Sequence, residues 1–116
     1  YSFADCMIYA KLKIDGDTWA AGITNKTGIS IAEKTKVRLK NGTAISNCTS
    51  CALIASHMGE ICTEAATGTG NNVAYYVRAG GKIFIAATSG NGHIAGTTQK
   101  DRATGGLIID PNGLIT

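Results

Sequence analysis

The sequence is poor in charge, in proline and in long apolar runs. Only 16% of the 116 residues are charged, and there is one proline. No stretch approaches the roughly 18 to 20 consecutive apolar residues that span a bilayer, so we expect no membrane span. The net charge of +3 is too small for the broad positive surface of a duplex-binding domain, and we expect no nucleic-acid partner.

What is present is an apolar content of 44% with abundant Gly, Thr, Ser and Ala. This composition is enough for one core and favours strands and turns over long charged helices. No internal repeat, low-complexity tract or linker is visible. We therefore expect a single domain over residues 1–116.

Four turn signals separate short β-prone runs. They are Asp15-Gly16-Asp17-Thr18, Asn41-Gly42, Gly80-Gly81 and Asp110-Pro111-Asn112-Gly113. The second and third predict β-hairpins, because Asn-Gly and Gly-Gly suit two-residue primed turns. We place strands near 29–32, 35–40 and 43–46, and we expect the run 73–88 to fold back on itself at Gly80-Gly81 as a central pair.

The segment between these hairpins predicts a helix over about residues 50–66. Its apolar positions recur at steps of three and four residues, without proline. They are Cys51, Ile54, Ala55, Met58, Cys62 and Ala65. The fold class expected is thus α+β, a two-layer sandwich in which a mostly antiparallel sheet packs on one main amphipathic helix.

The four cysteines favour structural disulfides. On an intact helix Cys51 and Cys62 lie about 16 Å apart, too far to bond or to share a metal. Elimination then favours Cys6 with Cys62 and Cys48 with Cys51; a broken helix leaves Cys48 with Cys62 and Cys6 with Cys51 open. We expect no metal and no cofactor.

A redox role is the alternative interpretation of Cys48-Thr49-Ser50-Cys51, which has the Cys-x-x-Cys spacing. Thioredoxin-like folds place that motif after a buried parallel strand and oppose it with a cis-proline. The only proline here lies in a terminal turn, so we favour disulfides, which imply an oxidising compartment.

A basic stripe is the main candidate binding site. On a strand near 35–40, side chains alternate between faces, so Lys34, Lys36, Arg38 and Lys40 share one face and Thr35, Val37 and Leu39 the other. The stripe could meet phosphates, acidic polysaccharide or anionic lipid head groups. The other interpretation, which we favour, is a solvated edge strand whose lysines discourage aggregation.

His57, Glu60 and His93 are weak catalytic candidates. Two histidines and a glutamate could perform general acid-base cleavage of RNA. Nothing in their spacing indicates such a site, and we favour the interpretation that both are surface histidines.

Three glycosylation acceptor patterns begin at Asn25, Asn41 and Asn47. The sequence opens on Tyr1 without a methionine, which favours removal of a leader segment. Together with the disulfides, these features predict a secreted, extracellular glycoprotein.

The early cysteine in 1-YSFADC-6, the cysteine-bearing helix and the strong hairpin after it resemble the small secreted proteins of fungi, the class of killer toxins and plant-pathogen effectors. The resemblance implies a compact α/β sandwich that binds a host or competitor macromolecule, either a protein or an anionic surface, without catalysis. The alternatives are a small secreted ribonuclease and a self-associating extracellular structural protein.

Overall fold

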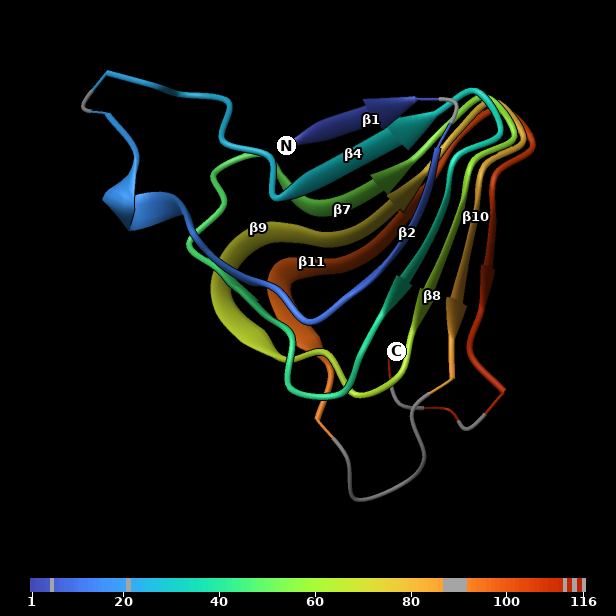
Figure 1. Cartoon of the computed structure of the whole chain (residues 1–116). Helices are drawn as coiled ribbons and strands as arrows, with labels where there is room; N and C mark the ends of the chain where they lie inside the picture. Colours follow the sequence, from blue (N-terminus) through green and yellow to red (C-terminus); the bar gives the residue numbers. More distant parts are fainter. Residues whose placement is uncertain (5, 21, 87–91, 112, 114, 116) are drawn as a thin grey trace.

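The computed structural model describes residues 1–4, 6–20, 22–86, 92–111, 113 and 115, and it shows a parallel β-solenoid (Figure 1). The strands are β1 (Ser2–Ala4), β2 (Met7–Ala10), β3 (Lys13–Asp15), β4 (Ile29–Ala32), β5 (Lys36–Leu39), β6 (Ala44–Ser46), β7 (Cys51–Ala55), β8 (Glu60–Thr63), β9 (Gly68–Val77), β10 (Lys82–Ile85), β11 (Ile94–Arg102) and β12 (Leu107–Ile109). The single helical element among the described residues is the 3-10 turn η1 (Gly16–Thr18).

Every strand pairs in parallel with a strand of the next coil. Sheet A has the order β1-β4-β7-β9-β11, sheet B the order β12-β10-β8-β5-β2, and sheet C contains β3 and β6. In sheet A the partners lie 28 residues apart from Ser2 to Ser30, 24 from Ile29 to Leu53, 22 from Leu53 to Tyr75 and 25 from Tyr75 to Lys100. The coils therefore differ in length while their registers stay aligned.

A four-residue turn forms the corner between sheets A and B in four successive coils. The turns cover 32–35, 56–59, 78–81 and 103–106, and each is closed by a backbone hydrogen bond of 2.9–3.1 Å from its last N–H to its first carbonyl. Both central residues have positive φ in every case, which defines a primed turn. Figure 1 shows these corners side by side where sheet A meets sheet B.

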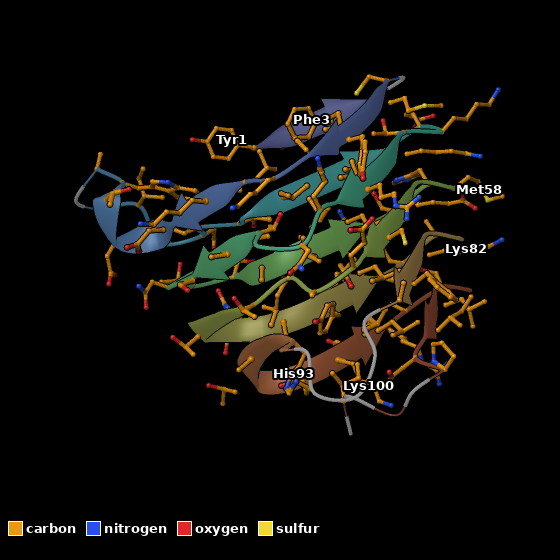
Figure 2. The ribbon with its side chains drawn as sticks, turned by 60° about the horizontal axis from the view of Figure 1, so that its bottom comes forward. Tyr1, Phe3, Met58, Lys82, His93 and Lys100 are labelled. Carbon is orange, nitrogen blue, oxygen red and sulfur yellow. The ribbon has the colours of Figure 1, made fainter. Side chains whose placement is uncertain are left out.

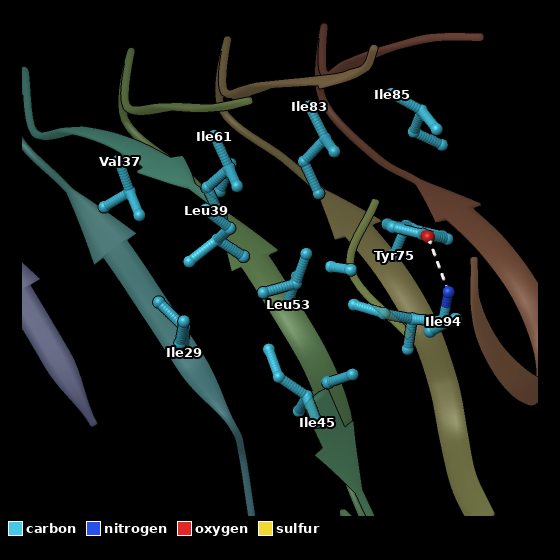
Figure 3. Packing of buried hydrophobic residues seen from close by; sticks show 14 of the residues in the cluster. Ile29, Val37, Leu39, Ile45, Leu53, Ile61, Tyr75, Ile83, Ile85 and Ile94 are labelled. Carbon is cyan, nitrogen blue, oxygen red and sulfur yellow. Dashed lines mark hydrogen bonds between the residues drawn. The ribbon is translucent and has the colours of Figure 1, made fainter. Parts of the chain in front are cut away.

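The core lies between the sheets and consists of side-chain ladders that run from coil to coil (Figure 3). In sheet B each strand contributes one inward aliphatic residue to a single ladder, in the order Ile8, Val37, Ile61, Ile83 and Ile108. β-branched side chains suit such a pleated, packed surface. Val37, Ile61 and Ile83 are fully buried, which is worth about 1.5–3 kcal/mol for each relative to exposure.

Asn71 and Tyr75 are two of the buried polar side chains that connect the coils from within. The buried Asn71 donates to the carbonyls of Ile45 and Ala95, at 3.0 Å each, and accepts from the N–H of Cys48 at 3.1 Å. The hydroxyl of Tyr75 accepts from the N–H of Ile94 at 3.0 Å, and burial raises the pKa of Tyr75 to about 12. Both residues satisfy backbone groups that the ladders leave unpaired.

The predicted α+β sandwich is wrong, and so is its helix over 50–66. That segment forms β7 in sheet A and β8 in sheet B, joined by the corner over 56–59. Met58, assigned to the buried helical face, lies in the corner and is 64% exposed. The apparent helical spacing arises because two strands that alternate with period two are offset by a turn.

The predicted hairpins are also wrong, although the strands at 29–32, 36–39 and 44–46 agree with the sequence analysis. Asn41-Gly42 leads from sheet B to sheet C, and the positive-φ pair near Gly80-Gly81 is Ala79-Gly80, a corner between β9 and β10. Residues 87–88 of the expected second arm, and parts of the expected turn and strand over 110–116, lie outside the described residues.

Candidate functional site

The outer face of sheet B is hollowed into a groove of about 520 Å³, which we call the sheet-B groove. It is lined by Met7, Ile8, Tyr9, Lys36, Val37, Arg38, Glu60, Ile61, Cys62, Lys82, Phe84 and Ile109. These residues come from all five strands of the sheet, so the groove crosses the strands and follows the solenoid axis.

Two columns of outward side chains run along the groove. The parallel register stacks Met7, Lys36, Glu60, Lys82 and Leu107 in the first column, called the charged column. The second, called the aromatic column, stacks Tyr9, Arg38, Cys62, Phe84 and Ile109. Successive members lie about 4.8 Å apart, the spacing of neighbouring strands.

Ion pairs link cations of the groove to two glutamates. Lys36 Nζ lies 3.4 Å and Lys82 Nζ 3.9 Å from the two carboxylate oxygens of Glu60. Arg38 Nε donates to Glu64 Oε1 at 2.8 Å, and this hydrogen bond raises the pKa of Arg38 above its ordinary value. All these side chains are solvent-exposed to a substantial degree, so the pairs contribute little stability and the cations stay accessible to a ligand.

Exposed rings and aliphatic groups lie beside these charges. Tyr9 is 60% and Phe84 38% exposed, and Met7 at the end of the groove is 81% exposed. The Arg38 guanidinium and Lys40 Nζ lie 5.6 Å and 5.1 Å from the centroid of the Tyr9 ring, within cation–π range. The groove thus offers both apolar contact and positive charge.

The alternation predicted for the basic stripe is present. Thr35, Val37 and Leu39 are buried, while Lys36 and Arg38 point outward from β5. Lys34 lies in the corner turn and Lys40 directly after β5, and both are exposed. Since β5 lies between β2 and β8, it is not an edge strand, and the interpretation of the stripe as edge protection does not apply.

The structure does not bring the three weak catalytic candidates together. His57 lies in the corner turn after β7, and Glu60 begins β8, where it pairs with lysines. His93 precedes the start of β11, at the other end of the sheet A strands, so about 30 Å of strand separates it from the corner. Figure 2 shows His93 well apart from Met58, the neighbour of His57.

The structure shows the four cysteines unpaired, and the fold separates Cys6 from its predicted partner. Cys6 precedes β2 and Cys62 lies in β8, two strands away and three residues further along, about 14 Å. A disulfide needs Cα atoms within about 7 Å, so Cys6 cannot bond to Cys62. The alternative partner Cys51 begins β7, whereas Cys6 follows the end of β1, at the opposite end of the sheet A strands.

The pair Cys48 and Cys51 stays a prediction. Both side chains are buried, and desolvation raises the pKa of both thiols above the ordinary value. A redox-active Cys-x-x-Cys pair requires the opposite shift, because the thiolate is the nucleophile. The raised pKa of these two thiols therefore argues against redox catalysis at this pair.

Among the described residues, no three His, Cys, Asp or Glu side chains gather in a way that could hold a metal ion. No helix in the same part of the chain is both long and apolar enough to cross a membrane.

Sequence reasoning missed the members of the groove outside β5. It assigned Phe84 to a pair of strands covered on both sides and interpreted Glu60 only as a catalytic candidate. The signal was available in 82-KIFI-85, which alternates as 36-KVRL-39 does and buries Ile83 and Ile85 while Lys82 and Phe84 point outward. That these strands lie two positions apart in one parallel sheet could not be inferred from the pattern.

Comparison of the chain with protein-family models, with curated proteins and with solved structures found no match.

Proposed function

We propose that the protein is a secreted, non-enzymatic binding protein that captures an anionic macromolecule in the sheet-B groove. This is the binding activity that the effector or toxin hypothesis requires. The proposal depends chiefly on one observation, the coincidence in one hollow of exposed rings with the accessible cations Lys36, Arg38 and Lys82.

The charge balance of the face supports an anionic partner. Four cations, at positions 36, 38, 40 and 82, face two carboxylates, at positions 60 and 64, which leaves two positive charges in excess. Because the ion pairs with Glu60 and Glu64 are exposed and weak, an approaching anion can replace the glutamates as the partner of these cations. Cations beside a low-dielectric apolar surface also attract an anion more strongly than isolated cations in water.

The surface positions of two glycosylation acceptors support the extracellular part of the proposal. Asn25 and Asn41 are exposed, so a glycan could be attached without disturbing the fold. Asn47 instead donates its side-chain amide to Asp15 Oδ1 at 2.9 Å, which also holds the pKa of Asp15 below its ordinary value. We therefore expect glycans at Asn25 or Asn41 and none at Asn47, which peptide mass mapping of native protein would check.

Charge reversal in the groove tests the proposal. The double variant Lys36→Glu and Arg38→Glu should bind immobilised heparin, a generic polyanion, at least about tenfold more weakly, because two attractive contacts become repulsive. The matched control is Lys100→Glu with Arg102→Glu, the same charge change at exposed positions of β11 in sheet A. The control should bind as the unchanged protein does.

Circular dichroism establishes that each variant folds. If the reversal variant does not fold, the neutral pair Lys36→Gln and Arg38→Gln asks the same question without new repulsion. An equal loss of heparin binding in the groove and control variants, or no loss in either, would show that the sheet-B groove is not the binding site.

A further inference from the structure

The charged column alternates in sign along the solenoid axis. Lys36 and Lys82 flank Glu60 on neighbouring strands, so the strands that carry the two lysines lie about 10 Å apart, and the Glu60 carboxylate contacts both ammonium groups between them. Glu60 contacts both lysines and is itself exposed, so it is available to a ligand as a hydrogen-bond acceptor. A ligand that fits must place anionic groups opposite Lys36 and Lys82, on every second strand, and hydrogen-bond donors opposite Glu60 between them.

This alternation is a poor match for a uniform polyanion. A single-stranded nucleic acid carries a phosphate on every unit, and a chain in the groove would place some of them against Glu60. An anionic lipid surface is flat and meets a hollow face badly. Like charges in contact cost binding energy, so the column selects against both.

An extended β-1,4-linked acidic polysaccharide matches the column. In such a ribbon one sugar advances about as far as one strand spacing, about 4.8 Å, and alternate sugars turn the same edge to the protein. Carboxylates then recur on that edge at about the separation of the two strands that carry Lys36 and Lys82, with sugar hydroxyls between them to donate to Glu60. Charged acceptors make the stronger hydrogen bonds.

The aromatic column supplies the apolar contacts that a sugar ring needs. Tyr9 and Phe84 lie three strands apart, about 14 Å, with Arg38 and Cys62 between them. Their exposed rings can pack against the C–H faces of sugars. Lys36 and Lys82 of the charged column then bind the carboxylates on the edge of the same chain. Four strands in this span correspond to about four sugars, at one sugar per strand spacing.

An extended peptide fits less well. The backbone N–H and C=O groups of β5, β8 and β10 are used in the parallel ladders on both sides. A peptide lying across the face could not add a strand, and its own backbone groups would meet few partners.

We propose, on the basis of the proposed function, that the groove binds an acidic polysaccharide. Its chain runs along the solenoid axis across β2, β5, β8 and β10. Lys36 and Lys82 bind carboxylates of alternate sugars, Glu60 accepts from the hydroxyls between them, and Tyr9 and Phe84 pack against rings at the two ends.

Calorimetry with β-1,4-linked oligomannuronates tests the ligand class. The tetramer and longer chains should bind, whereas the dimer and neutral cello-oligosaccharides of equal length should bind at least about tenfold more weakly, since each lacks contacts made by the tetramer. Tyr9→Ala should weaken binding about fivefold, and the exposed aromatic control Tyr1→Ala should not change it.

The variant Glu60→Gln distinguishes an acidic polysaccharide ligand from a uniform polyanion. Removing the carboxylate should weaken oligomannuronate binding by about tenfold, the worth of one hydrogen bond to a charged group. For a uniform polyanion such as oligouridylate the same change should tighten binding, because it removes a repulsion.

Tighter binding of oligouridylate or of phosphatidylserine vesicles than of oligomannuronate would overturn the polysaccharide while leaving the groove as an anion site. Tighter oligomannuronate binding by Glu60→Gln than by the unchanged protein would likewise overturn the polysaccharide and leave the groove as an anion site. If neither these probes nor heparin depended on Lys36 and Arg38, the proposed function itself would fail.

Discussion

The buried phenol of Tyr75 makes the stability of the fold depend on pH in the alkaline range. Its side chain is fully buried in the core, and its hydroxyl accepts from the N–H of Ile94 at 3.0 Å. Desolvation is the main cause that raises the pKa to about 12 from an ordinary value of 10.0. The folded protein therefore holds the phenolic proton more tightly than the unfolded chain does.

The sign and size of the effect follow from that difference. Because the folded pKa is the higher one, the contribution is fully present below about pH 10 and is lost progressively as pH rises toward about 12. Two pKa units correspond to about 3 kcal/mol of unfolding free energy. This is a large fraction of the stability of an ordinary domain.

The assay is urea denaturation followed by circular dichroism between pH 8 and 12, for the unchanged protein and for Tyr75→Phe. At pH 8 the variant should be less stable by about 1–2 kcal/mol, because the N–H of Ile94 loses its acceptor. At pH 12 it should equal or exceed the unchanged protein, since it has no phenolate to bury. Parallel pH curves for the two proteins would refute the reasoning.

Two further predictions concern a corner and the thiols. Gly81→Ala should lower the unfolding free energy by about 2–3 kcal/mol in denaturation, because the new Cβ would lie 2.2 Å from the carbonyl oxygen of Ala55 and backbone must move. Gly59→Ala lies at the same position of another corner, and its new Cβ would meet the end of the Ile31 side chain at 3.0 Å, so it should lower the unfolding free energy by less. Equal losses of unfolding free energy in the two variants would contradict the packing argument. In native protein, thiol labelling should be fast at exposed Cys6, slower at Cys62 and blocked at Cys48 and Cys51 until unfolding, and mass analysis before and after reduction would reveal any Cys48–Cys51 disulfide.

The sequence predicted individual strands well and their partners poorly. The alternation in 35–40 located β5, its buried face and its exposed cations, because the side-chain period of a strand is a local property. Parallel and antiparallel neighbours leave nearly the same alternation in a strand, so the pattern could not distinguish a hairpin from a coil. Coils of 28, 24, 22 and 25 residues also hide the repeat, since no fixed period runs through the chain.

The turn residues were open to two structural interpretations. Two successive residues with positive φ close a hairpin when the flanking strands pair with each other, and they form a corner when those strands enter different sheets. In this chain the second case holds at the four corners over 32–35, 56–59, 78–81 and 103–106. Over 50–66 the same geometry produced a spacing that imitates a helix.

By itself the sequence indicated one domain's worth of apolar residues, strands near 29–32, 35–40 and 43–46, and the outward orientation of Lys36 and Arg38. Only the tertiary structure decided that β2, β5, β8 and β10 lie side by side, so that Tyr9, Glu60 and Phe84 join those cations in one groove. The physical reason is that alternation along a strand is set by neighbouring residues, whereas the columns across strands are set by register between segments 22 to 29 residues apart.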